Sequence, residues 1–239
     1  MKRFYETVTI DTTQDGAYVL KLDGKPVKTP GQNTLMSFYK PLSDSVRAEW
    51  EAQEESINPK TMPLTQLLNT KIDHIDNETN RERMASEAGR FLDSELICYY
   101  AEAPQDLVQK QRSHWRPLQE WFEKRAGCAL NTVSGIQFAE QDETLKFWGQ
   151  KTMAAMDPYK FTAFQAALGP VSSFVIALAF VEEEIDLDTA FQAAFIEELY
   201  QAEHWGIDEE AEKKRQDALN ELREIRNFLD LSTKNAPKR

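Results

Sequence analysis

Three kinds of side chain in this sequence could do chemistry: histidines, nucleophilic thiols and hydroxyls, and carboxylates. A histidine metal site needs imidazoles close together on one face, as in HExxH or HxH. The three histidines, His74, His114 and His204, are far apart in the chain and form neither pattern. The sequence therefore predicts no metal site.

Nucleophilic catalysis and phosphate binding have equally little support. No serine lies in a GxSxG elbow, and no GxGxxG follows a predicted strand. Residues 24–30, GKPVKTP, contain glycine and lysine but lack the spacing GxxxxGK[ST], and they lie between predicted strands instead of before a helix. We predict no catalytic residue, no cofactor and no small-molecule substrate.

Carboxylates are abundant, notably at residues 182–184 and at the neighbours Glu197 and Glu198. A converging pair would allow acid–base chemistry, as in a hydrolase, but a solvated acidic face is the favoured interpretation. The 40 acidic and 28 basic residues give a net charge of −12. Nucleic acid and anionic membrane surfaces are therefore not expected as partners. The longest apolar run, residues 171–181, is too short for the roughly 20 residues that span a bilayer, and it predicts a buried helix.

Cysteine usage and the first residues bear on the compartment. Cys98 and Cys128 form no disulfide framework, which favours a reducing compartment. The opening segment MKRFYETVTI alternates like a strand and has no apolar signal region. We predict no targeting segment in these opening residues.

The first 78 residues predict a small antiparallel β-sheet with a covering helix. Period-two alternation and Asp-Gly turns indicate four strands, at residues 5–11, 17–22, 25–28 and 34–38. A helix beginning at Pro41 places Leu42, Val46 and Trp50 on one face and covers the sheet. A second helix enters through Pro63.

The remainder, residues 79–239, predicts a helical bundle domain, so the fold class is α+β. Its longest aromatic-rich helix begins at Pro104 and ends at Gly127, which supplies the left-handed residue after the helix. Its buried face is expected to consist of Leu107, Gln111, Trp115, Leu118 and Phe122.

The segments on either side of this helix are less regular. Residues 96–100 are expected to be an extended connector, and residues 232–239 a frayed tail. One helix is expected to start at Asp188 as its cap and to end at Gly206, and Asp208 is expected to cap the last helix.

Two segments are candidate contact surfaces. In the first, Tyr200, Glu203, His204 and Trp205 gather at a helix end within residues 197–214. Trp205 either staples two helices together or binds a partner, and both interpretations stay open. In the second, Trp50 accompanies the proline-limited loop at residues 58–64, where a contact that joins domains is favoured over binding.

These same residues carry a resemblance that covers nearly the whole chain. The matching segments, in order, are KRFYETVTI, LDGKPVKTP, AEWEAQ, INPKTMPLTQLLNT, FLDSELICYY, LVQKQRSHWRPLQEWFEKRAG and YQAEHWG. In this order and spacing they resemble the F1 ATP synthase assembly chaperones that bind the α subunit, a family found in mitochondria and related bacteria.

The resemblance implies a chaperone that is not an enzyme. It also implies a bacterial cytoplasmic protein, or a mitochondrial matrix protein if the chain is a mature organellar form. This chaperone would bind unassembled α subunit, shield its interface from aggregation and be displaced by the β subunit. The client-binding residues that we expect are Tyr200, Glu203, Trp205, Glu197, Glu198, Trp50 and Met62. Two alternatives stay open: an acidic adaptor with a different client, and a hydrolase with a concealed carboxylate pair.

Overall fold

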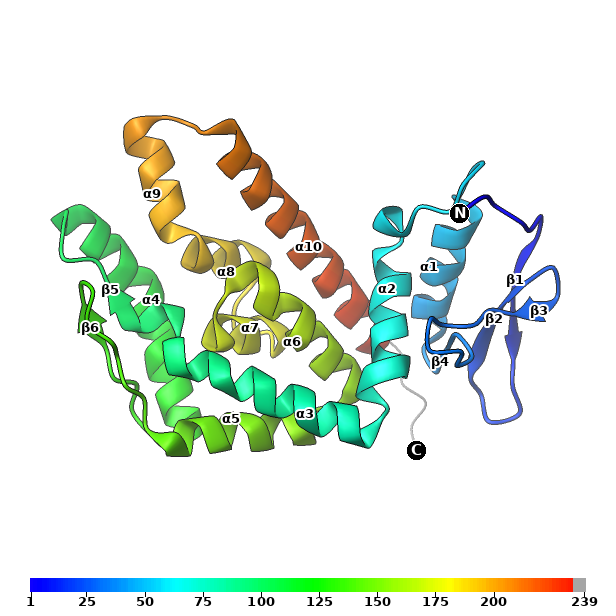
Figure 1. Ribbon diagram of the computed structural model, residues 1–239, viewed down its shortest axis with the longest axis horizontal. Helices are drawn as coiled ribbons and strands as arrows, with labels where there is room; N and C mark the ends of the chain where they lie inside the picture. Colours follow the sequence, from blue (N-terminus) through cyan, green and yellow to red (C-terminus); the bar gives the residue numbers. More distant parts are fainter. Residues whose placement is uncertain (234–239) are drawn as a thin grey trace. The chain divides into compact units, whose positions relative to one another are not determined.

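A computed structural model describes residues 1–233, which form two compact units (Figure 1). The first unit contains Met1–Arg81, Asp157–Ala163 and the described residues from Glu224 onward. The second contains Glu82–Met156 and Phe164–Arg223. The division into domains at residues 1–78 and 79–239 stays a prediction.

The first unit opens with the predicted four-stranded antiparallel sheet. Its strands are β1 (Val8–Thr12), β2 (Tyr18–Leu22), β3 (Lys25–Pro26) and β4 (Met36–Ser37). β2 pairs with all three others, and Ile10 lies opposite Leu20 in the β1–β2 register. The strands are shorter than predicted, but their order and pairing sense confirm a small antiparallel sheet.

The turn at Asp23-Gly24 explains the tight reversal between β2 and β3. Asp23 and Gly24 have φ values of 47° and 78°, which suit an Asp-Gly type I′ turn. The Asp23 carboxylate also accepts hydrogen bonds from the backbone N–H of Thr7 at 2.9 Å and of Glu6 at 3.1 Å. These bonds lower the pKa of Asp23 and tie the turn to the start of the chain.

Two helices pack beside this sheet. α1 (Lys40–Glu51) contacts β1 and β2 through a face that includes the buried Leu42 and Val46, as predicted. α2 (Pro63–Thr70) packs on α1, and its first turn is capped by Glu49, whose carboxylate accepts the N–H groups of Leu64 and Thr65, both at 2.8 Å. α2 continues into a short π-helix at Lys71–Ile75.

Tyr159 joins distant parts of the chain within the first unit. Its ring lies 4.9 Å from that of Tyr39 and 5.9 Å from that of the fully buried Phe228, measured between centroids. Its hydroxyl is 3.2 Å from Ser37 Oγ. Segments near residues 37, 159 and 228 thus share one core.

Helices dominate the rest of the described chain, as the α+β prediction requires. They are α3 (Glu78–Gly89), α4 (Gln105–Ala126), α5 (Glu143–Ala155), α6 (Pro158–Val171), α7 (Phe174–Val181), α8 (Leu187–Ala194), α9 (Ile196–Trp205) and α10 (Glu209–Thr233). Strands β5 (Tyr99–Tyr100) and β6 (Val133–Ser134) pair in parallel.

α4 confirms the prediction for the longest aromatic-rich segment. Its face of Leu107, Gln111, Trp115, Leu118 and Phe122 is buried, and Gly127 ends it with a φ of 70°. Trp115 donates a hydrogen bond from Nε1 to the Ala193 carbonyl at 2.8 Å, which fixes α8 against α4.

The predicted extended connector at residues 96–100 is wrong in its first half. Leu96–Cys98 forms a 3-10 turn, because the side chain of the preceding Glu95 accepts the Ile97 N–H and caps it. The same carboxylate accepts the Ser173 hydroxyl and the N–H groups of Phe174 and Val175. Glu95 therefore caps α7, a helix whose eight residues are all buried.

Two further expectations need correction. The single helix expected to end at Gly206 is two helices, α8 and α9, since Phe195 leaves the helical conformation at φ −111° and ψ 22°. Asp186, and not Asp188, caps α8 by accepting the Thr189 N–H at 2.8 Å. Asp208 caps α10 as predicted, accepting the Ala211 N–H at 2.8 Å.

The predicted tail also begins too early, because Ser232 and Thr233 belong to α10. Residues 234–239 lie outside the described part of the chain.

Candidate functional site

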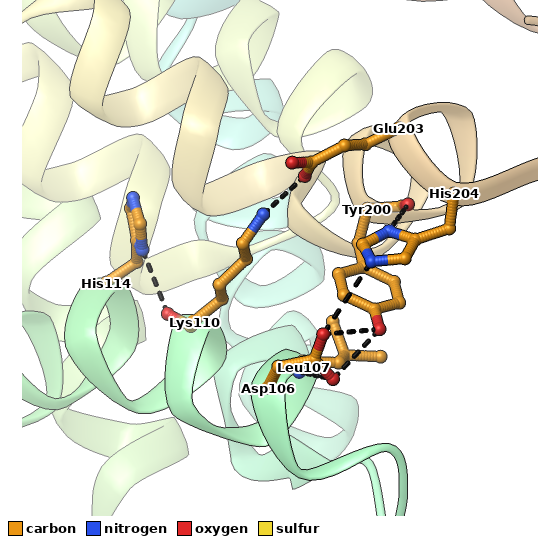
Figure 2. A network of polar contacts seen from close by, with 7 residues as sticks. All are labelled: Asp106, Leu107, Lys110, His114, Tyr200, Glu203 and His204. Carbon is orange, nitrogen blue, oxygen red and sulfur yellow. Dashed lines mark hydrogen bonds and ion pairs between the residues drawn. The ribbon is translucent and has the colours of Figure 1, made fainter. Parts of the chain in front are cut away.

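The first predicted surface lies where α9 packs on α4, entirely within the second unit. We call it the α4–α9 corner and define it as Asp106, Lys110, Tyr200, Glu203 and His204 (Figure 2). Asp106 and Lys110 are four residues apart and share a face of α4. The other three share a face of α9 at spacings of three and four. Helical periodicity on both partners thus gathers five polar side chains in one place.

Each helix contributes partners for the other. Tyr200 donates from its hydroxyl to both Asp106 carboxylate oxygens, at 2.9 and 2.8 Å. Lys110 Nζ forms an ion pair with Glu203 Oε2 at 2.5 Å (Figure 2). These two contacts lie side by side and join α4 to α9 at the protein surface.

His204 completes the corner. Its ring stacks on that of Tyr200 with centroids 3.9 Å apart, and Nδ1 lies 2.9 Å from the Tyr200 carbonyl oxygen. Because a carbonyl only accepts, Nδ1 carries the proton. Nε2 is 3.7 Å from Asp106 Oδ2, so this contact becomes an ion pair when the imidazole is doubly protonated.

The electrostatics of the corner favour ionised carboxylates. The Tyr200 hydroxyl bond lowers the pKa of Asp106, and Lys110 lowers the pKa of Glu203. Burial and the Asp106 carboxylate raise the pKa of the Tyr200 phenol, which stays protonated as a donor. The corner therefore presents two carboxylates and one ammonium group near neutral pH. The Glu203 side chain remains 60% exposed, so it can exchange its partner.

Trp205 extends the corner outward. It is 73% exposed, and it meets the Tyr200 ring edge-on with centroids 6.2 Å apart. Ile207, two residues further on, is 70% exposed. An aromatic and an aliphatic side chain thus face solvent beside the charged cluster.

The other predicted client-binding residues lie elsewhere. Glu197 is half-buried and accepts a hydrogen bond from Gln111 Nε2 at 2.7 Å. Its pKa is raised, mainly by burial and to a lesser extent by the negative charge of Glu198. Glu198 is exposed. Trp50 is half-buried beside Tyr5, and Met62 is 2% exposed; both belong to the first unit. Their part in client binding stays a prediction.

Sequence reasoning missed Asp106 and Lys110. Their partners on α9 are more than 90 residues away, so no local spacing could reveal them. The available signal was weak: Asp106 lies in the first turn of α4, where a carboxylate also suits the helix dipole.

Two of the carboxylates with a raised pKa, Glu95 and Glu49, serve as helix caps. Glu95 is fully buried with hydrogen bonds to both oxygens, and Glu49 caps α2. Within residues 1–233, no group of histidine, cysteine and acidic side chains is arranged to hold a metal ion. Nor is any helix in this range both long and apolar enough to cross a membrane.

Comparison with known proteins agrees with this architecture. The family described as "ATP12 chaperone protein" matches residues 2–123, more than half of the chain. The mitochondrial protein atp12 of Schizosaccharomyces pombe is 25% identical over 236 residues, covering 92% of this chain and 79% of the relative.

Two solved bacterial structures share the fold over almost the whole chain. Atp12 from Paracoccus denitrificans superposes with a TM-score of 0.86 at 31% identity, covering 97% of this chain and 98% of that one. The Atu1473 protein from Agrobacterium tumefaciens superposes with a TM-score of 0.85 at 33% identity, covering 96% and 85%.

A small antiparallel sheet followed by a helical majority places the chain in the α+β class, with the architecture of these bacterial structures. The chain belongs to the ATP12 chaperone family, the F1 ATP synthase assembly chaperones that its sequence resembles.

Proposed function

We propose that this chaperone binds the unassembled α subunit of F1 ATP synthase and shields its interface from aggregation until the β subunit displaces it. Family membership and the order of the matching segments support this client. The observation that carries the proposal is the α4–α9 corner, where the exposed Trp205 adjoins a solvated acidic cluster. Aromatic anchors beside charged groups are typical of protein interfaces.

The contacts of the corner suit a partner that must later leave. An unassembled subunit exposes apolar surface that would aggregate, and a chaperone protects it by covering that surface. The Lys110–Glu203 pair is exposed on both sides and contributes little to stability. Client side chains can therefore replace it without damage to the fold, and a tighter partner can displace the chaperone.

The client test uses Glu203→Lys in the full chain. This change places a cation where the client meets an anion, so capture of α subunit should fall strongly while the melting temperature changes little. Lys110→Glu is the matched partner, and the double variant restores an ion pair of reversed polarity. If the double variant keeps the wild-type melting temperature but does not recover capture, Glu203 acts on the client and not within the bundle.

Two results would contradict this assignment. Undiminished capture by folded Glu203→Lys would remove the corner from the client site and leave the loop at residues 58–64 as the next candidate. Loss of thermal stability with a proportionate loss of capture would make Glu203 a structural residue.

Capture of a different dominant protein by the wild type would favour the adaptor alternative.

We also propose that the chain has no enzymatic activity. The sequence lacks a nucleotide loop, and among the carboxylates with a raised pKa, Glu49 and Glu95 serve as helix caps and Glu197 is hydrogen-bonded to Gln111. The isolated protein should neither bind nor hydrolyse ATP. Calorimetric titration checks this, and saturable heat on addition of ATP would contradict it.

The proposed compartment is the bacterial cytoplasm, with the mitochondrial matrix as the alternative. Identity of 31% to the Paracoccus protein, against 25% to the fission yeast mitochondrial protein, supports the bacterial assignment. Cell fractionation with an antibody against the chain tests it.

A further inference from the structure

A second exposed apolar surface lies in the second unit, on the connection between α4 and α5. We call residues 131–141 the 131–141 loop. Its outer part presents Ile136, which is 106% exposed, and Phe138, which is 68% exposed. Single apolar side chains are common on protein surfaces. Two large ones within three residues, both mostly in solvent, instead indicate a contact surface.

The base of this loop is firmly held. Gln141 is buried; its Oε1 accepts the Asn131 N–H at 3.0 Å, and its Nε2 donates to the Asn131 carbonyl at 2.7 Å. The Asn131 side chain donates to the Glu140 carbonyl at 2.7 Å, which closes the loop a third time. The two ends of the loop are thus clamped together.

The first half of the loop, residues 133–135, is fixed as well. Val133 and Ser134 pair with Tyr99 and Tyr100, and the Gly135 N–H donates to the Tyr100 carbonyl at 3.0 Å. Gly135 then turns with a φ of 76°, a conformation that glycine adopts freely. The tip is therefore preorganised, and a partner that binds it avoids most of the cost of ordering a loop.

The charges around the tip are acidic. Residues 128–142 contain no lysine or arginine, and Glu140 is exposed beside Phe138. On the other side, the exposed Glu102 lies close enough to Gly135 that an added Cβ would come within 2.5 Å of its Oε1. The apolar tip thus has carboxylates near it and no cation within its own segment.

This charge pattern selects among possible occupants. An anionic membrane would be repelled by the carboxylates, and so would a second copy of the same tip on a chain of net charge −12. An apolar groove bordered by lysine or arginine on another polypeptide would instead complement both the side chains and the charge.

The loop is also connected to the α4–α9 corner through α4. Gln111, which is fully buried, accepts the Ala101 N–H at 2.9 Å and donates to Glu197 on α9 at 2.7 Å. One side chain thus holds both the residue after β5 and the helix that carries Glu203. Two surfaces whose supporting segments are both held by α4 can engage one client at the same time.

We propose that Ile136 and Phe138 form a second docking surface, which inserts into a basic-bordered apolar groove of the same α-subunit client. This inference rests on the proposed function, since it names a second contact for that client. Loss of this second surface should weaken capture of the α subunit, while the contact through the α4–α9 corner remains.

The experiment compares the double variant Ile136→Ser with Phe138→Ser against Phe4→Ser, a control in the first unit whose phenylalanine is 64% exposed. Dissociation constants for the α subunit are measured with the full chain, and melting temperatures are recorded on the same preparations. We expect about a tenfold loss of affinity for the double variant, an unchanged value for Phe4→Ser, and melting temperatures near that of the wild type.

A second experiment tests whether the client groove is bordered by basic residues. Glu140→Lys should slow association with the α subunit and reduce the salt dependence of that rate. Asp15→Lys, an exposed control in the first unit, should change neither.

Four outcomes would each overturn the inference. Equal affinity of the double variant overturns it and leaves the proposed function intact, whereas failure of the wild type to capture α subunit overturns both. A wild-type dimer in sedimentation that the double variant loses would assign the tip to a second copy of this chain. Co-sedimentation of the wild type, but not the variant, with phosphatidylcholine–phosphatidylglycerol vesicles would assign it to a membrane.

Discussion

Two polar clusters in the second unit use the same side-chain chemistry in opposite surroundings. Around Glu95, a carboxylate with no solvent exposure accepts four hydrogen bonds and fixes the start of α7. At the α4–α9 corner, the carboxylates of Asp106 and Glu203 are more than half exposed and join two helices from outside. One cluster is part of the core, and the other faces water.

The difference separates fixed contacts from exchangeable ones. Breaking a buried hydrogen bond leaves a polar group without water, which costs about 1 to 3 kcal/mol. Breaking an exposed ion pair returns both groups to solvent at almost no cost. The core can therefore keep its geometry while the corner gives up its internal partners to a client.

The strongest test of a rigid interior is Trp115→Ala. Trp115 is 1% exposed and bonds the Ala193 carbonyl, so its removal opens a cavity and leaves an unpaired acceptor. We expect the free energy of unfolding to fall by about 3 to 5 kcal/mol, measured by urea titration. Trp205→Ala, at a 73% exposed tryptophan, is the control and should cost about 0.5 kcal/mol or less. Equal midpoints for both variants would contradict the distinction.

The Glu95 cluster predicts a smaller loss. Glu95→Gln replaces one acceptor oxygen by a donor NH2 group, which leaves at least one of the N–H groups of Ile97, Phe174 and Val175 unpaired. We expect a loss of about 1 to 3 kcal/mol at pH 5 by the same titration. Glu198→Gln, at an exposed carboxylate on α9, serves as the control and should change little.

The same variant sharpens the comparison through pH. Burial raises the pKa of Glu95 from 4.5 to about 7. The folded protein therefore holds a proton that the unfolded chain releases between these values, so stability falls as pH rises from 4.5 through 7. The wild type should lose stability relative to Glu95→Gln between pH 5 and pH 8. Parallel curves for the two proteins over this range would show that Glu95 does not titrate there.

The smallest effect is expected at the corner. Lys110→Ala removes the ion pair with Glu203, yet the melting temperature should shift by about 1 °C or less, since both side chains are largely solvated. Differential scanning calorimetry at low and high salt measures this. A large, salt-insensitive shift would mean that the corner is a structural joint like the Glu95 cluster.

Local patterns predicted the elements that depend on local physics. The spacing of Trp115, Leu118 and Phe122 identified the buried face of α4, and Gly127 identified its end. The Asp23-Gly24 turn and the alternation around it identified the sheet. In each case the determining residues lie within one or two turns of one another.

Features that depend on distant residues were not predictable. Glu95 caps α7 across 79 residues of chain, and Tyr200 reaches Asp106 across 94. The interruption at Phe195 was missed because neither glycine nor proline marks it, and Ala193 and Ile196 are both buried on either side. Packing between helices determines these details, and the local residue patterns of a single sequence do not show which distant helices pack together.

The core around Tyr159 has a consequence for synthesis on the ribosome. The sheet and α1 precede the second unit in the chain, but Phe228, which contacts Tyr159 in the core of the first unit, follows it. All residues of the second unit have been made by Arg223. The first unit therefore receives its full complement of residues only after the whole second unit has been made, so its folding finishes later.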